Sequence, residues 1–173
     1  MENLNPATVV STIVVLAFAG LVFAAAISDV LRYIVPNRLC LAVCLLYPVH
    51  ILSATRPVSW QDAVLIAVLA LVAGFALFAW GKWGGGDAKL FAAVALWAGP
   101  SLFLEMALIT SLAGGVMALF IWLQHRLARA PGLMLALAPD PDPDFDIMQA
   151  QIPYGAAIAV GALYVAFTLL KVG

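Results

Sequence analysis

The chain is a series of long apolar runs separated by short polar breaks. Runs of this length with almost no internal charge are typical of helices that cross a lipid bilayer. No stretch shows the alternation of apolar and polar residues that marks a half-buried strand, so we expect an all-α protein. The segments that we expect to be helical are residues 8–27, 39–53, 63–80, 88–98, 102–123 and 152–170.

The composition indicates a chain that is almost entirely embedded in a membrane. Of its 173 residues, 65% are hydrophobic and only 10% are charged, and the mean hydropathy is +1.09. A soluble domain of this size would contain about a quarter charged residues. We therefore expect one polytopic integral membrane domain over residues 1–173, with about six transmembrane helices in the lipid bilayer. The net charge of −1 gives no indication of nucleic-acid binding.

Basic residues collect on one side of this predicted topology. With both termini outside, the outer side holds only Arg56 and Lys171. The positive-inside rule then places the opposite loops in the cytoplasm. The basic residues of the inner side are Arg32, Arg38, Lys82, Lys89, Arg126 and Arg129.

Two aspartates lie at the ends of apolar runs on the inner side. Asp87 follows a triple glycine at 84–86, and Asp29 ends the first run. A carboxylate in or beside a membrane is unfavourable and marks a functional site by default, and the glycines would let another chain approach closely. We expect the two carboxylates to lie close together. The structural alternative makes Asp87 a helix cap and Asp29 a helix-end residue paired with Arg32.

Two carboxylates that share a site can act as acid and base at the same time. The ionised one takes a proton from water while the protonated one activates a carbonyl, as in aspartyl peptidases, without a metal or another cofactor. The sequence contains no zinc-protease motif and no serine nucleophile elbow. We expect His50 and His125 to be structural or interfacial, and Cys40 and Cys44 to be small apolar residues rather than zinc ligands or a disulfide.

Three short motifs follow one another along the chain. They are Ser28-Asp29 with Val35-Pro36-Asn37-Arg38, then Gly84-x-Gly86-Asp87-x-Lys89-Leu90, and finally Pro153-Tyr154-Gly155. Together they resemble the type IV prepilin peptidase family, polytopic aspartyl peptidases of the Gly-x-Gly-Asp kind. The family often has isoleucine where Val35 stands, and an aliphatic residue is kept here.

The resemblance implies a role for each motif residue. Asp29 and Asp87 would be the catalytic pair. The active-site loop would contain Gly84, Gly86 and Lys89, and the candidates for contact with the substrate are Pro36, Asn37, Pro153, Tyr154 and Gly155. The substrate would be a prepilin or pseudopilin, cut behind its basic leader at the cytoplasmic face of the bacterial inner membrane. The oligomeric state is left open.

The chain contains no Cys-x-x-Cys pair and only a short stretch before the first run. It therefore resembles the short, peptidase-only form of tight-adherence (Flp-type) pilus systems, without the domain that accompanies N-methylation. Alternating proline and aspartate at 139–146 predicts an extended, solvated segment. This segment is either an acidic lip that attracts a basic leader or a plain connection.

Two other functions are compatible with paired acids in a membrane protein. A small proton- or ion-coupled transporter would use them as a relay. Transporters usually show internal repeats, and none is evident here, while both acids lie near one face. A non-enzymatic assembly protein of a secretion system would tolerate amides at both positions.

Overall fold

The computed structural model describes residues 6–54, 56–81, 83–128 and 153–172. Over these residues the chain forms helices and no strand, which confirms the all-α prediction. The helices are α1 (Pro6–Arg32), α2 (Asn37–Ser53), α3 (Trp60–Ala79), α4 (Gly85–Ala128) and α5 (Tyr154–Val172).

Four of these helices, α1, α3, α4 and α5, are long and apolar enough to cross a membrane, whereas α2 is shorter. Large apolar side chains such as Leu16, Leu69 and Leu112 are exposed along them. Contiguous exposed apolar surface of this kind is expected where a protein faces lipid. The chain is therefore a membrane-embedded helical protein, and the expected total of about six transmembrane helices stays a prediction.

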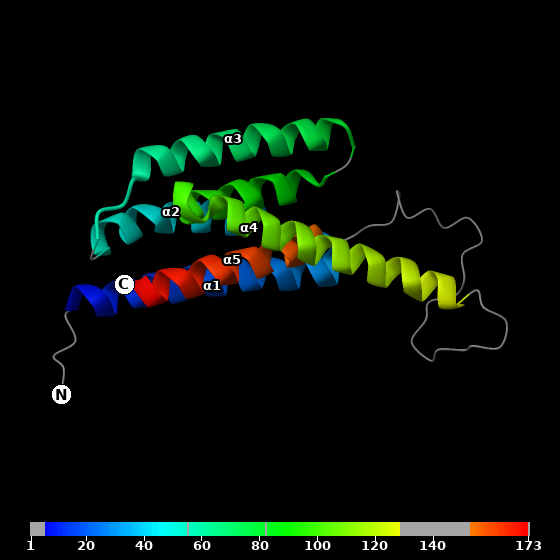
Figure 1. Cartoon of the computed structure of the whole chain (residues 1–173), viewed down its shortest axis with the longest axis horizontal. Helices are drawn as coiled ribbons and strands as arrows, with labels where there is room; N and C mark the ends of the chain where they lie inside the picture. The colour runs from blue at the N-terminus through cyan, green and yellow to red at the C-terminus, as the bar shows by residue number, and fades with distance from the viewer. Residues whose placement is uncertain (1–5, 55, 82, 129–152, 173) are drawn as a thin grey trace.

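Helix α4 is a hairpin of two helical arms. Gly99 has a left-handed φ of 56° with a ψ of −170°, and Pro100 follows it. The rings of Phe91 and Phe103 lie 6.2 Å apart, whereas a straight helix would separate these positions by about 18 Å. The first arm (residues 85–98) and the second arm (residues 100–128) therefore run in opposite directions, as Figure 1 shows. The break predicted after residue 98 is a reversal of the chain.

Two predicted helix boundaries are wrong in a way that affects the aspartates. Helix α1 continues past residue 27 to Arg32, and α4 begins at Gly85 instead of residue 88. Both Asp29 and Asp87 therefore lie inside helices. The apolar runs indicate only the apolar part of each helix, and polar turns that extend a helix beyond it carry no hydropathy signal.

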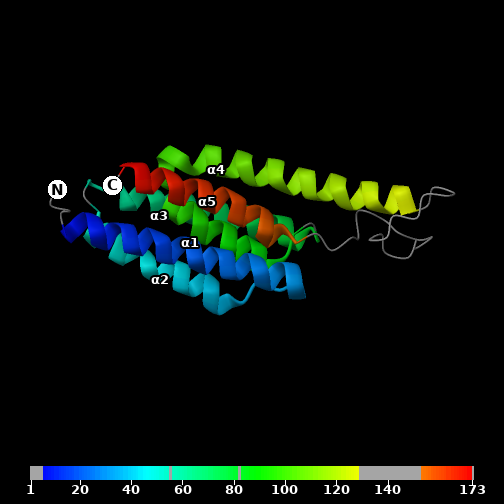
Figure 2. The ribbon, with the colours of Figure 1, turned by 90° about the horizontal axis from the view of Figure 1, so that it is seen from below.

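The helices lie roughly lengthwise, with the start of α1 and the end of α5 at one end of the bundle (Figures 1 and 2). The end of α1 and the starts of α4 and α5 lie at the opposite end. Helix α1 packs on α2 and α5, and α4 packs on α2, α3 and α5. This topology gathers the Asp29, Asp87 and Pro153 motifs at one end.

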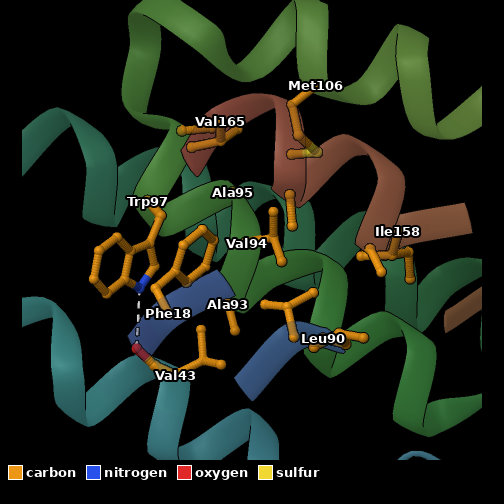
Figure 3. Packing of buried hydrophobic residues seen from close by; sticks show 14 of the residues in the cluster. Phe18, Val43, Leu90, Ala93, Val94, Ala95, Trp97, Met106, Ile158 and Val165 are labelled. Carbon is orange, nitrogen blue, oxygen red and sulfur yellow. Dashed lines mark hydrogen bonds between the residues drawn. The ribbon is translucent and has the colours of Figure 1, made fainter. Parts of the chain in front are cut away.

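An aromatic cluster fixes the first arm of α4 in the centre of the bundle. The rings of Phe18 and Trp97 stack at 4.2 Å, and the indole N–H of Trp97 donates to the carbonyl oxygen of Val43 at 3.0 Å. Phe18 and Val43 are completely buried, and Figure 3 shows the three side by side. Since these residues come from α1, α4 and α2, the cluster sets the depth of the arm that begins with Asp87.

The second arm of α4 packs closely on α5 at Gly161, which gives the first prediction. A Cβ there would meet the Thr110 hydroxyl and would lie 2.9 Å from the backbone oxygen of Met106. We expect Gly161→Ala to lower the free energy of unfolding by about 1–3 kcal/mol, because the backbone must shift. Titration of the purified protein with SDS in mixed micelles measures this.

The control is Gly115→Ala, because nothing lies within 4 Å of a Cβ at that helical position. Replacing an unhindered helical glycine by alanine stabilises by about 0.5–1 kcal/mol. Equal stability of the two variants would show that the arm and α5 do not approach as closely as described.

Candidate active site

Asp29 projects from the last turns of α1 to the start of α5. It is only 4% exposed. Its Oδ2 accepts a hydrogen bond from the backbone N–H of Gly155 at 2.7 Å. The carboxylate also interacts, more weakly, with the backbone N–H of Ala156. The first N–H groups of a helix have no partner within it and carry a partial positive charge. A side chain of α1 therefore caps α5.

This contact explains the glycine of the Pro153-Tyr154-Gly155 motif. A Cβ on Gly155 would lie 2.8 Å from Oδ2 and 3.0 Å from Cγ of Asp29. Gly155 is buried, so its structural role is to admit the carboxylate.

The other two residues of this motif make contacts of their own. The ring of Tyr154 packs edge-on against Trp83 at 6.4 Å, and the carbonyl oxygen of Pro153 accepts a hydrogen bond from the backbone N–H of Ala156 at 3.1 Å. Substrate contact by these motif residues stays a prediction.

Asp87 lies in the first turn of α4 and is 9% exposed. Its carboxylate accepts from the backbone N–H of Gly84, as acids at the third helical position do in a capping box. A Cβ on Gly84 would come within 2.6 Å of Oδ2. The other oxygen, Oδ1, is buried and has no hydrogen-bond partner within the described part of the chain. Asp87 therefore caps its helix and still keeps one acceptor that water or a substrate could engage.

The two carboxylates lie close enough for the charge of Asp29 to act on Asp87. The link that follows α1 helps to hold them there. Tyr33 adopts a left-handed φ of 52° and turns the chain, and Val35 then packs against the start of α4. A Cβ on Gly86 would lie 3.1 Å from both Cβ and the carbonyl oxygen of Val35. The close approach expected at the triple glycine is thus an approach of the chain itself.

Lys89 and Asn37 form a polar pair at the edge of this site. The Lys89 ammonium donates to Oδ1 of Asn37 at 3.0 Å and links α4 to α2. Pro36 precedes α2 and is half-buried. The motifs place these residues near the aspartates but do not pair them. Tyr33 was missed altogether, because a tyrosine gives no sequence signal for positive φ.

The structure also describes His50 and both cysteines. His50 is buried and stacks on Trp97 at 5.0 Å, and Cys40 and Cys44 are free thiols. No group of three or more metal-ligating residues occurs in the ranges that the structure describes. The acidic segment 139–146 and the side chain of His125 lie outside the described residues.

Two buried carboxylates at one end of an apolar helical bundle are compatible with acid–base chemistry or with proton movement. The type IV leader peptidase family matches residues 16–119, which is more than half of the chain and includes both aspartates. The chain belongs to this family, which indicates a peptidase that acts on prepilin leaders. Neither the curated proteins nor the solved structures searched contain a match.

The family match confirms the resemblance that the motifs indicated. The short Flp-type form stays a prediction. The Pro153-Tyr154-Gly155 motif lies beyond the matched residues, and its place in the site comes from the contact with Asp29.

The Gly155 contact gives the second prediction. Gly155→Ala should push the Asp29 carboxylate away from α5 and remove its hydrogen bond. We expect the free energy of unfolding to fall by about 1–3 kcal/mol and leader cleavage to slow by at least about tenfold. SDS titration and a gel assay of a co-expressed prepilin measure the two effects.

Gly114→Ala is the matched control, since a Cβ there makes only ordinary contacts at 3.7 Å with Ala157 and Tyr154. This variant should change neither the free energy of unfolding nor the rate of leader cleavage by much. Wild-type cleavage by Gly155→Ala would mean that α5 does not position Asp29.

Proposed function

We propose that this chain is an aspartyl endopeptidase of the Gly-x-Gly-Asp type that removes the basic leader of prepilin-like proteins. Asp29 and Asp87 are the catalytic pair. The observation that carries the proposal is that two segments distant in sequence bring two buried carboxylates to the same end of the bundle. Peptide cleavage by water is accelerated by an acid–base pair of this kind, because the water must lose a proton while the scissile carbonyl is activated.

Water is the nucleophile in this proposal. One carboxylate accepts a proton from the water as it attacks the scissile carbonyl, and the other carboxyl group donates a hydrogen bond to the carbonyl oxygen. The pair returns to its first state when the leaving amine takes up a proton. Oδ1 of Asp87 is suited to such contacts, because no described group occupies it. The N–H of Gly155 holds Asp29 in a fixed orientation, which helps to position the attacking group.

The site faces the cytoplasm in this proposal. Arg32 ends α1 and Lys89 lies near the start of α4, at the aspartate end of the bundle, whereas Lys171 lies in the last turn of α5, at the opposite end. Arg38 lies in the first turn of α2, Arg126 in the last turn of α4, and Arg56 in the link between α2 and α3. This distribution follows the positive-inside rule. A prepilin anchored in the same membrane would present the junction between its leader and its apolar helix at this depth, and cleavage would release the leader to the cytoplasm.

The third prediction tests the pair. Asp29→Asn and Asp87→Asn should each lower prepilin cleavage by at least about 100-fold, because an amide cannot exchange a proton with water or substrate. Both variants should still insert in the membrane, since asparagine keeps the size and much of the capping ability. Co-expression with candidate prepilins, read out as a mass shift on a gel, measures the effect.

Asp62→Asn is the control, because Asp62 is an exposed acid in the first turn of α3. It should cleave like the wild type. Near wild-type cleavage by either amide variant of the pair would exclude the two-aspartate mechanism and leave a structural role for that acid. The transporter would be favoured if the wild type cleaved no prepilin but conducted ions, and if the two amide variants lost this ion flux.

A fourth prediction concerns metals. Since the carboxylates activate the water, EDTA or 1,10-phenanthroline should leave the cleavage rate of the purified enzyme unchanged. Loss of activity that added zinc restores would indicate ligands outside the described residues.

A further inference from the structure

An apolar groove of about 520 Å³ runs along the bundle between α2 and α3, with the first arm of α4 as its floor. Each helix contributes one face two turns long; on α2 these residues are Asn37, Cys40, Leu41 and Cys44. This spacing of three, four and seven residues is the face that a helix presents to a neighbouring helix. Helix α2 packs on α1 and α4, and α3 packs on α4, so none of the five described helices lies in the space between α2 and α3.

One end of the groove meets the proposed active site. Its polar residues are Asn37 and Lys89, which are bonded to each other. Lys89 lies two residues beyond Asp87, and the thiol of Cys40 lies 4.0 Å from the carbonyl oxygen of Gly86. From Lys89 to Leu96 the floor extends away from the site for about 10 Å along the helix axis. The groove is therefore polar where it touches the site and apolar beyond it.

The walls of the groove face the surrounding lipid. Leu41, Val64 and Val68 line it and are 58%, 43% and 50% exposed. An apolar segment moving within the membrane could enter from the side without crossing a polar surface.

We propose that this groove binds the first two turns of the apolar helix that follows the scissile bond of the substrate. This inference rests on the proposed function. The groove continues directly from the proposed active site, which favours the substrate helix as its ligand. A substrate whose scissile peptide bond lies at Asp87 would next meet the Lys89 end of the groove and then the apolar part of the groove. Substrate selection then depends on an apolar helix directly after the cut, in addition to the leader itself.

Filling the groove tests the proposal. Ala67 is a half-buried lining residue of α3, and Ala67→Trp would occupy the space of the substrate helix. We expect kcat/KM for prepilin cleavage to fall at least about tenfold, mainly through KM, because ground-state binding is lost. Ala73→Trp is the matched control: Ala73 is exposed on the same helix and does not line the groove. It should cleave like the wild type.

Disulfide trapping at the native thiol of Cys44 provides a second measurement, which needs no bulky substitution in the groove. Cys44 is half-buried in the groove, and Cys40 is buried. In a Cys40→Ala, Asp29→Asn enzyme, which keeps the prepilin uncleaved, single cysteines placed along the start of the prepilin helix should form disulfides with Cys44 when copper phenanthroline is added as the oxidant. We expect adducts at positions spaced three or four residues apart, and none with Cys44→Ala.

If the wild type cleaves the prepilin while Ala67→Trp keeps its KM and Cys44 forms no adduct, the groove is a lipid site and the proposal is wrong. If the wild type cleaves no prepilin, the proposed function fails first and this inference falls with it.

Discussion

The arrangement of the site depends on the hydrogen bond from the N–H of Gly155 to the carboxylate of Asp29. A carboxylate inside an apolar bundle is unfavourable unless polar groups compensate its desolvation. The start of α5 supplies these groups, because its first N–H groups need acceptors from outside the helix. The two requirements satisfy each other, and α1 and α5 are thereby fixed in register at the end of the bundle that holds both aspartates. Glycine is needed at 155 because a larger residue would displace the acid.

Asp87 is placed by a different constraint, the reversal of the chain at Gly99. The first arm of α4 has about 14 residues and so spans roughly 21 Å, less than a hydrocarbon core of about 30 Å. Trp97 anchors the far end of this arm to Phe18 and Val43. The short arm starts below the surface of the bundle, where Asp87 is buried beside Asp29. The same arm forms the floor of the groove, so one element connects Asp87 with the proposed substrate groove.

Hydropathy is sufficient to predict the helical class and the break at Gly99. Motif order selects the residues of the proposed site, and their catalytic role stays a prediction. Hydropathy and motif order predict neither where α1 ends nor that Asp87 lies within α4, because polar turns at helix ends give no apolar signal. The contact between Gly155 and Asp29 joins segments far apart in sequence, and a motif shows that a glycine is present without showing what approaches it. Tyr33 adopts a positive φ, which residues other than glycine rarely do, so its sequence context does not predict the turn. The groove forms only when α2, α3 and α4 are packed together, so no local sequence pattern predicts it.

The central claim is that Asp29 and Asp87 act as one unit, and a double-mutant cycle tests it most directly. Single-turnover cleavage rates would be measured for Asp29→Asn, Asp87→Asn and the double variant against one prepilin. Residues that act as a unit are strongly non-additive, so removing the second should add little to the loss from the first. We predict that the double variant is no slower than the slower single variant within about threefold. Losses that multiply would contradict the account, because they would show two aspartates that work independently.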